Sequence, residues 1–558
     1  MPINNLKSIY VLFVCLLFFA GEVALQWSSG AFSSEFGASP DEGGHYVTGL
    51  MVRDYIAALQ PVSPMRFAED YYVHYPKVAL GHWPPFFYIV QTIWTLPFSP
   101  SRASMLLLMA LLTTLLAGSV YLAVREQFGA KAGIAAGLLL IALPLIQEYS
   151  GMVMAEVLLA LLSFQAVLCL GRFMDTERWQ DAIGFGIYAT LAILTKGTGL
   201  ALALVPPLAV LFSRRFYLLA RPFFWYPAVI VLVLCGPLCW LTRHMIQNGW
   251  HQGLPSPDFT IAAIQYYSKQ LTEITGLGLS LLVVTGFIVK FIQPFRHKET
   301  EGKWVAVGTL LLSVWIFHCI VPCGLEARHL IPAVPSLLMF LVAGVAWIAN
   351  RLPLRQLTTE RRMAVLGLIA AMVFAGETFA ISKKAWYGFE SVAERLLSTP
   401  DFQKSVFLVA SDPAGEGMFI SEVAMREDRP GHIVLRASKV LGMSRWGGNE
   451  YEALFSTPDE MLTYLKGVPV GIVIVDFSVS KKHQVKHHHL LKEALEANSE
   501  CWELLGTYPL TRQGTEYPNA LYVYRLVGHE NRPVGPIRLD MHHMLNKVLA
   551  TSEGFADE

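Results

Sequence analysis

Residues 102–124 have the sequence RASMLLLMALLTTLLAGSVYLAV, in which Arg102 is the one charged residue. A helix needs roughly 20 consecutive apolar residues to cross a bilayer, so this stretch predicts a membrane-spanning helix. Ten other stretches have a similar character, although several are near the short limit for a span. They cover residues 8–28, 131–147, 153–171, 181–195, 198–213, 223–242, 272–294, 304–322, 328–349 and 363–382.

The composition also indicates a membrane protein. Of the 558 residues, 54% are hydrophobic and 15% are charged, whereas soluble domains carry roughly a quarter charged residues. The shortage of charge is deepest before residue 382 and nearly absent afterwards. We therefore predict a polytopic α-helical membrane protein of about 11 transmembrane helices, with a C-terminal extracytoplasmic α/β domain. The predicted parts are a membrane domain over 1–382 with a first loop over 29–101, a linker over 383–400, a soluble mixed α/β domain over 401–528, and a poorly ordered tail over 529–558.

The C-terminal part has short apolar runs of the kind that form buried strands. Strands are predicted at residues 406–410, 470–476 and 521–526, and helices at residues 458–466 and 488–498. The histidines of residues 483–489 resemble a metal-binding tract. They lack a partner Cys or an acidic cluster at ligand spacing, so a solvated helix start is favoured there.

Positive charges in the short loops predict the orientation in the membrane. With a cytoplasmic N-terminus, every short cytoplasmic loop holds at least two basic residues and the opposite loops hold far fewer. The first loop and everything after residue 382 then lie outside the cytoplasm, at the outer face of the cytoplasmic (inner) membrane. The aromatic-rich first loop is expected to contain interfacial helices. The stretch 8–28 follows Lys7 as a signal peptide does, but its length and the absence of a clear cleavage site favour a retained helix.

Charge and cysteine content exclude other classes. The net charge is +0, so no nucleic-acid partner is expected. The seven cysteines lie mostly in apolar stretches and form no disulfide framework. Two pairs, Cys235/Cys239 and Cys319/Cys323, have the i,i+4 spacing that suits a metal or redox pair. Free Cys in apolar surroundings behaves as a small hydrophobe, so we expect inert thiols and no metal site.

The tetrad Ser39-Pro40-Asp41-Glu42 follows the first predicted span. Ser at the N-cap, Pro at N1 and Glu at N3 form a capping box that would start a helix over 43–59. Glu42 is then either a cap or a second catalytic acid. Adjacent helical residues face different directions, so Asp41 can point away from the cap, and it is our candidate catalytic base. His45, one turn later, either orients that carboxylate or is a plain interfacial residue.

Three further charged residues lie at the outer ends of predicted spans. Glu156 opens the fourth span, where an acid usually faces a polar cavity; the alternative is an exposed helix-start Glu favoured by the helix dipole. Lys196 and Arg328 lie on the same side, against the basic-inside trend. They either extend to lipid head groups or bind an anion, which Arg contacts with two parallel bonds and Lys as a point charge. His82, in the first loop, either donates to a phosphate or sugar or packs the loop.

The order of these residues resembles the GT-C glycosyltransferases, specifically the family that includes protein O-mannosyltransferases and the aminoarabinose transferases of lipid A. The resemblance covers residues 8 to 350. Many relatives have Lys directly before the Pro pair, where this chain has Trp83, and His82 and Lys77 are the candidates to contact the donor phosphate there. The matching motifs are Asp41-Glu42 after the first span, His82 to Pro85, Arg102 before the second span, Glu156 opening the fourth, Thr195 to Gly197, and Arg328 to Pro332.

The resemblance implies a polyprenyl-phosphate sugar donor, contact with membrane lipid, and transfer at the outer face to a lipid, glycan or protein acceptor. Inverting transfer by single displacement needs one base, for which Asp41 is the candidate. A phosphate leaving group needs positive charge, which Lys196 and Arg328 supply, and Glu156 is free to bind hydroxyls of the sugar or acceptor. A retaining double displacement needs two facing carboxylates, for which neighbouring residues such as Asp41 and Glu42 are poorly placed. No cofactor and no obligatory metal are implied.

Two other functions are compatible with a polytopic chain. A lipid-linked saccharide transporter or flippase needs charged residues within its spans, and the predicted spans carry few. A non-catalytic membrane scaffold leaves the one-sided set of Asp41, Glu156, Lys196 and Arg328 unexplained. The sequence therefore favours a glycosyltransferase.

Overall fold

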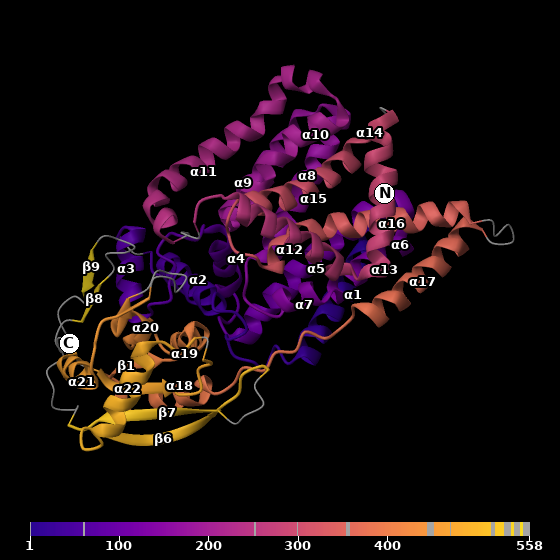
Figure 1. Ribbon diagram of the computed structural model, residues 1–558. Helices are drawn as coiled ribbons and strands as arrows, with labels where there is room; N and C mark the ends of the chain where they lie inside the picture. The colour runs from indigo at the N-terminus through magenta and orange to yellow at the C-terminus, as the bar shows by residue number, and fades with distance from the viewer. Residues whose placement is uncertain are drawn as a thin grey trace.

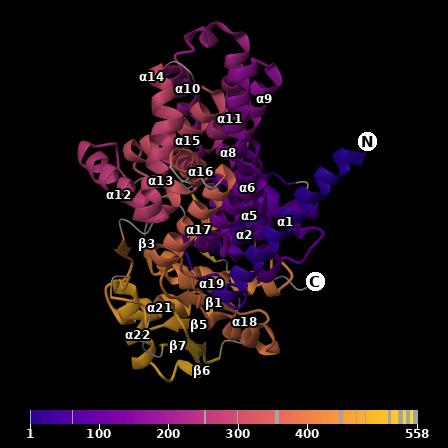
Figure 2. The same cartoon turned by 90° about the vertical axis from the view of Figure 1, so that its right-hand side faces the viewer.

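The computed structural model describes residues 2–59, 62–249, 253–297, 300–352, 358–443, 451–468, 470–481, 483–514, 519–528, 537–540 and 547–550. Figure 1 shows a large helical body formed by the N-terminal part of the chain and a smaller α/β body, orange to yellow, formed by the C-terminal part. Figure 2 shows from the side that the α/β body lies against one end of the helical body. The chain therefore has a membrane-type helical bundle with a domain attached at one end.

Seven helices in the described ranges are long and apolar enough to cross a membrane. An eighth span results if α6 (Ala130–Ala142) and α7 (Pro144–Ser150), which are bent by 64°, form one unit. The chain is a multi-span membrane protein, as predicted. The seven are Ile9–Ser29 in α1 (Pro2–Ser29), α5 (Arg102–Phe128), α8 (Glu156–Thr176), Pro222–Arg243 in α11 (Pro222–Gly249), Leu277–His297 (α13, Leu277–Phe287; η3, Ile288–Ile292; α14, Gln293–His297), α15 (Gly302–Ile320), and Ala327–Arg351 (η4, Ala327–Ala333; α16, Val334–Arg351).

Each predicted apolar stretch is largely helical, but several differ from a single straight span. Pro144 breaks the stretch 131–147, because Pro cannot continue the preceding helix. The stretches 181–195 and 198–213 form the 17-residue α9 (Trp179–Thr195) and the pair η1 (Gly197–Leu204) and α10 (Val205–Ser213), which are shorter than an ordinary span. Residues 363–377 of the last stretch lie in α17 (Thr359–Glu377), whose first turn is charged, and residues 378–382 follow that helix. These breaks explain why the described residues contain seven or eight full-length spans, whereas about 11 were predicted.

The first loop is folded into three helices, α2 (Glu42–Ala57), α3 (Pro64–His74) and α4 (Phe86–Thr95). Several of its aromatic side chains are buried within the protein: Tyr46, Tyr71, Tyr72, Tyr75 and Phe87 are each at most 2% exposed. These five aromatic residues therefore form packed core. The helical body also contains η2 (Phe216–Ala220) and α12 (Pro257–Thr275).

The α/β body is built on a five-stranded mixed sheet of order β2-β1-β5-β7-β6. β1 (Val406–Ala410) pairs in parallel with β2 (Val434–Arg436) and β5 (Val470–Asp476), and β7 (Asn519–Leu526) pairs antiparallel with β5 and β6 (Trp502–Leu510). Every residue of β1 and β5 is buried, as expected for strands covered on both faces. The three predicted strands match β1, β5 and β7, and the two predicted helices match α21 (Pro458–Gly467) and α22 (Lys486–Ala497).

Smaller elements complete this body. α18 (Phe389–Leu397) lies in the stretch predicted as a linker and packs against α19 (Pro413–Arg426). Residues 529–558, predicted to be poorly ordered, lie mostly outside the described ranges; among them β8 (Arg538–Asp540) and β9 (Val548–Ala550) pair antiparallel. The remaining elements are η5 (Pro400–Phe402), α20 (Ala437–Val440), β3 (Gly442–Met443) and β4 (Glu452–Ala453).

The α/β body docks on the first loop through α19 and the segment that follows it. Gly43 of α2 is so close to α19 that a Cβ on it would lie 2.8 Å from the carbonyl oxygen of Gly417. Past the end of α19, Arg429 donates from Nε and Nη2 to the two carboxylate oxygens of Asp54, at 2.8 and 3.2 Å. A close helix contact and a two-bond ion pair therefore join α2 to this body.

Two further polar contacts reinforce the docking. Glu35, just after α1, accepts the backbone N–H groups of Gly388 at 2.6 Å and Phe389 at 3.0 Å, where α18 starts. Tyr75, after α3, donates to Glu427 at 2.5 Å. Buried acceptors are costly unless they are hydrogen-bonded, so these contacts favour one docked arrangement.

The ion pair between Arg429 and Asp54 provides a test of this arrangement. Arg429→Met leaves the Asp54 side chain, 16% exposed, with the weaker partners Tyr71 and Arg53. Breaking a buried ion pair on one side costs about 3 kcal/mol or more, so we expect a lower thermal midpoint and faster limited proteolysis between α17 and α18. The exposed Arg395 of α18 supplies the matched control, Arg395→Met. Equal proteolysis rates for the wild type and both variants would contradict a docking role for Arg429.

Candidate functional site

Four charged side chains from separate parts of the chain meet near the start of α2. Asp41 directly precedes α2, and Glu156 is the first residue of α8. Lys196 separates α9 from η1, and Arg328 lies in η4. The structure thus brings together four of the eight candidate site residues.

Arg328 is at the centre of this charged cluster. Its Nη1 lies 2.9 Å from Oδ2 of Asp41 and 3.6 Å from Oε1 of Glu156. Its Nε lies 2.6 Å from Oε2 of Glu326. The same Glu156 oxygen accepts a bond from Nζ of Lys196 at 2.5 Å. Oε2 of Glu156 is buried and has no hydrogen-bond partner among the described residues, so it can accept one from a ligand.

A tight reversal of the chain directs Lys196 toward α8. Its backbone is extended, with φ −156° and ψ 138°, and ends α9. The N–H of Gly199 donates to the carbonyl of Lys196 at 2.8 Å, and a Cβ on Gly199 would lie 2.7 Å from the carbonyl group of Ala192. Glycine is therefore needed for η1 to fold back on the end of α9, and this reversal leaves Lys196 beside Glu156.

Asp41 combines a fixed partner with partial access. Its side chain is 31% exposed, compared with 13% for Arg328 and 2% for Glu156. Burial raises the pKa of Asp41, but the charge of Arg328 and its hydrogen bond outweigh burial and lower that pKa to about 2. The carboxylate is therefore ionised at neutral pH and reachable from one side.

His45 contacts aromatic residues more closely than it contacts the cluster. Its ring stacks on Trp83 with centroids 4.0 Å apart, and its Nδ1 lies 2.9 Å from the hydroxyl of Tyr88. Burial lowers the pKa of His45 to about 4, so the ring is neutral near pH 7. Its side-chain hydrogen bond goes to Tyr88, and the contact with Asp41 is its backbone N–H, which donates to the Asp41 carbonyl at 2.9 Å.

Glu42 does not form the predicted capping box, and that prediction is wrong. α2 begins at Glu42, and the N-cap residue Asp41 has helical φ and ψ without a side-chain cap bond. Glu42 is fully buried, and its Oε1 accepts from Arg102 at 2.7 Å and from the backbone N–H of Val153 at 3.3 Å. Leaving a buried carboxylate without a cation costs more free energy than leaving a helix start without a side-chain cap. Glu42 therefore connects α2 to α5 and to the turn before α8, whereas its neighbour Asp41 pairs with Arg328.

His82 and Lys77 are both buried in the first loop. The ring of His82 lies 5.0 Å from that of Trp83, and burial lowers the pKa of His82 to about 3. Nζ of Lys77 donates to the carbonyl of Pro413 at 3.0 Å, so this side chain reaches the start of α19. A contact between Lys77 and the donor phosphate, as predicted, would therefore have to replace or share its hydrogen bond to Pro413 of the α/β body.

Two neighbours of the cluster were not singled out from the sequence. Glu326 precedes Arg328 by two residues and pairs with it, and Tyr88 follows the Pro pair and holds His45. Glu326 gave no clear sequence signal, because residues two positions apart do not face each other on a helix. Tyr88 had none, because one Tyr among many aromatic residues in this loop is not distinctive.

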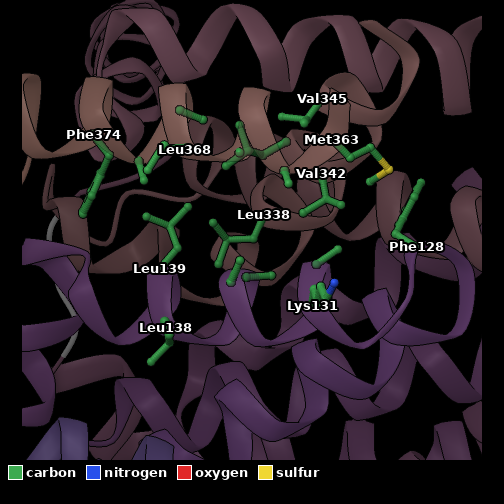
Figure 3. Close-up of a pocket in the computed structure, with 18 of the residues that line it drawn as sticks. Phe128, Lys131, Leu138, Leu139, Leu338, Val342, Val345, Met363, Leu368 and Phe374 are labelled. Carbon is green, nitrogen blue, oxygen red and sulfur yellow. The ribbon is translucent and has the colours of Figure 1, made fainter. Parts of the chain in front are cut away.

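A separate apolar cavity of about 820 Å³ lies between α5, α6, α16 and α17 (Figure 3). Leu138 and Leu338 are among its lining residues. Lys131, near one end, pairs with Glu360 at 2.8 Å, and Phe374 lies at the other end. None of the four residues of the charged cluster lines this cavity, so the cluster and the cavity are distinct features.

Comparisons with known proteins agree with this architecture. Residues 82–240 match the family model described as Dolichyl-phosphate-mannose-protein mannosyltransferase. ArnT from Cupriavidus metallidurans, solved with undecaprenyl phosphate bound, aligns with a TM-score of 0.57 and 15% identity over 94% of this chain and 99% of that chain. The oligosaccharyltransferase of Archaeoglobus fulgidus in its apo form aligns with a TM-score of 0.56 and 14% identity over 93% and 76%. By sequence, the chain matches no curated protein.

A third structure extends the likeness. AglB from Archaeoglobus fulgidus, in complex with an inhibitory peptide and a dolichol-phosphate, aligns with a TM-score of 0.52 and 13% identity over 97% of this chain and 77% of that chain. At such identities the likeness is one of fold. ArnT and AglB are GT-C glycosyltransferases, so the resemblance inferred from the order of motifs is confirmed: this chain has a GT-C-like fold with a mixed-sheet C-terminal domain.

The buried Lys77 makes a test of the site's surroundings possible. Burial, and then the nearby Arg436, lower the pKa of Lys77 from 10.5 to about 7. Between these two values the unfolded chain holds a proton that the folded chain lacks, so folding stability rises with pH through this window and is lowest below it. We expect the thermal midpoint of the wild type to rise with pH relative to that of Lys77→Met. The exposed Lys383 gives the control, Lys383→Met, and a wild-type-to-Lys77→Met difference that stays constant with pH would contradict the account.

Proposed function

We propose that this chain is a membrane glycosyltransferase that moves a sugar from a polyprenyl-phosphate donor to an acceptor hydroxyl, with inversion and in a single displacement. One observation carries the proposal: the partly exposed carboxylate of Asp41 lies 2.9 Å from the guanidinium of Arg328, with Lys196 and Glu156 beside them. One ligand bound at this site can contact both the base, Asp41, and the anion-binding pair, Arg328 and Lys196. The printed ligands of the solved relatives, undecaprenyl phosphate and dolichol-phosphate, support a lipid-phosphate donor.

In this reaction the acids and the cations of the cluster have different roles. The acceptor oxygen attacks the anomeric carbon and gives its proton to Asp41. The bond from that carbon to the phosphate oxygen breaks, and its electron pair leaves with the lipid phosphate. Arg328 and Lys196 stabilise the charge that develops on this leaving group, so no general acid is needed. Oε2 of Glu156, which lacks a hydrogen-bond partner in the described chain, accepts a sugar or acceptor hydroxyl.

Donor binding would also activate the base. While Arg328 is paired with Asp41, the pKa of that carboxyl is about 2, and it is a weak base. A donor phosphodiester carries one negative charge, as a carboxylate does, and it offers Arg328 two oxygens for parallel hydrogen bonds. When the guanidinium turns to the phosphate, Asp41 loses its strongest stabilising charge and its pKa rises. The carboxylate thus becomes a better base only when donor is present.

The position of Glu42 supports single displacement. A double displacement needs two carboxylates on opposite faces of one sugar carbon, about 5 Å apart, with separate roles. Glu42 is fully buried and its Oε1 pairs with Arg102 at 2.7 Å, so its carboxylate is not exposed to a sugar carbon. Glu156 is held by Lys196 at 2.5 Å. Asp41 is the more accessible of these three acids, which favours one base and inversion.

The proposed location is the outer face of the cytoplasmic membrane, with the N-terminus in the cytoplasm. The charged cluster and the basic loops lie at opposite ends of α8. Glu156 is its first residue, whereas Asp175, near its last, pairs with Arg215 at 3.0 Å. Basic loops mark the cytoplasmic side, so the cluster belongs to the other side. The α/β body, which docks on the loop that follows Asp41, shares that side.

Replacement of the base tests the reaction directly. Asp41→Asn keeps the size of the side chain and an acceptor for Arg328 but cannot take a proton. With a panel of polyprenyl-phosphate sugars and acceptors, we expect release of polyprenyl phosphate to fall about 100- to 10,000-fold. The control is Asp70→Asn, at an exposed acid of α3. Equal release by the wild type and Asp41→Asn would remove Asp41 as the base, and silence of the wild type with every donor and acceptor would favour a transporter.

The pH profile tests the coupling between Arg328 and Asp41. Arg328→Gln removes the charge that lowers the pKa of Asp41, so this pKa rises and a smaller fraction of the carboxyl is ionised at acid pH. At donor concentrations far below KM, where the profile reports the donor-free enzyme, we expect residual transfer by Arg328→Gln to fall as pH is lowered, while the wild type shows no loss that is due to Asp41. The two profiles are compared after scaling to their maxima, because loss of phosphate binding lowers the overall rate. Superimposable profiles would contradict the coupling.

A further inference from the structure

Three side chains that could bind a metal meet beside the start of η4. His318 lies in the last turn of α15, Cys323 lies in the short connection that follows, and His329 lies in η4. A ring nitrogen of each histidine and the sulfur of Cys323 lie within 4.8 Å of one another. The exposed fractions of the three residues are 1%, 5% and 4%.

Hydrogen bonds fix which nitrogen of each histidine is available. Nδ1 of His318 lies 2.8 Å from the carbonyl oxygen of Val314, which can only accept, so Nδ1 carries the proton. The hydroxyl of Tyr267 donates to the carbonyl of Gly324 at 2.7 Å and lies 2.8 Å from Nδ1 of His329. Because the hydroxyl of Tyr267 already donates its one proton to Gly324, Nδ1 of His329 must carry a proton and donate it to the hydroxyl oxygen. Both histidines therefore carry a free lone pair on Nε2.

One of these lone pairs is left without a partner. Nε2 of His318 is buried and makes no hydrogen bond within the described chain. Leaving a buried polar atom unpaired is costly, and a native protein usually satisfies it with water or an ion. Metal-bound histidines commonly donate their other N–H to a carbonyl or a similar acceptor, as both histidines do here. The arrangement has the form of a metal site with its supporting hydrogen bonds already in place.

We propose that His318, Cys323 and His329 bind a zinc ion. Two imidazole nitrogens and one thiolate are ligands that zinc prefers, and a tetrahedral site leaves the fourth position to water or another donor. Ideal bond lengths place such ligand atoms about 3.5 Å apart, so small side-chain rotations complete the site. Magnesium and calcium are disfavoured because they prefer oxygen ligands.

The structure separates the two cysteines of the Cys319/Cys323 pair. Their i,i+4 spacing does not place both on one helix, because α15 ends at Ile320 and Cys323 lies beyond it. Cys319 stays on the helix, while Cys323 reaches the two histidines. Cys323 therefore has a candidate role that Cys319 lacks.

Zinc at this position would tie the end of α15 to the start of η4. His329 directly follows Arg328, the central residue of the charged cluster. The three ligands are distinct from Asp41, Glu156 and Lys196, so the ion would hold the backbone that carries Arg328 and need not take part in transfer. The inference goes beyond the proposed function, and it stands or falls on metal binding alone.

Metal content of the full-length protein in detergent tests the site. We expect about one zinc ion per chain in the wild type and in Cys319→Ser, and a loss of most of this zinc in Cys323→Ser. After chelation, added Co²⁺ should give a thiolate-to-cobalt absorption band in the wild type and in Cys319→Ser but not in Cys323→Ser. Equal zinc content in all three proteins, or no binding of added Zn²⁺ or Co²⁺ by the wild type, would overturn the proposal.

A milder variant guards against misfolding of the ligand variants. Tyr267→Phe removes the hydroxyl that accepts the Nδ1 proton of His329 but leaves all three ligands. Loss of such a supporting bond weakens metal binding about 10- to 100-fold, which a competition titration with a chelator measures. Unchanged affinity for Zn²⁺ in Tyr267→Phe would contradict the assigned role of His329.

Discussion

The ion pairs of Arg328 hold the candidate site together. One guanidinium, 13% exposed, lies within 4 Å of Asp41, Glu156 and Glu326, which come from three different segments. Carboxylates placed this close repel one another strongly where water is largely excluded, so they can share a site only with a cation between them. Lys196 neutralises Glu156 from the other side. The start of α2, the start of α8 and η4 therefore depend on one another for their positions.

Other buried ion pairs fix the neighbouring elements in the same way. Glu42 and Arg102 fix the start of α2 against α5, and Asp54 and Arg429 fix its other end to the α/β body. Asp41 thus precedes a helix that ion pairs hold at both ends. A catalytic group requires rigid support of this kind. The proposed zinc site would add a comparable restraint beside Arg328. Both partners of the central ion pair then rest on fixed backbone, while the pair itself remains free to open for a donor phosphate.

Hydropathy and charge were sufficient to predict the membrane bundle and the α/β body, because apolar length and charge content are local properties of the sequence. They also singled out Asp41, Glu156, Lys196 and Arg328 as candidates, and the structure brings these four side chains together. The contact between Asp41 and Arg328 could not be predicted, since 287 residues separate them and their meeting depends on tertiary packing. The capping box failed for a related reason: Ser39 and Glu42 have the right local pattern, but Arg102, brought from 60 residues away, is the stronger partner for a buried carboxylate. The proximity of Cys323 to His318 and His329 could not be predicted either, because it depends on the chain leaving α15 after Ile320 and returning in η4.

The position of a bound lipid phosphate tests the central claim most directly. A cryo-electron microscopy structure of the full chain in a lipid nanodisc with polyprenyl phosphate would locate that group. We predict that its phosphate lies within hydrogen-bond distance of Arg328 and Lys196, with the Arg328–Asp41 contact lengthened relative to 2.9 Å. A phosphate bound elsewhere, with that ion pair intact, would contradict the account.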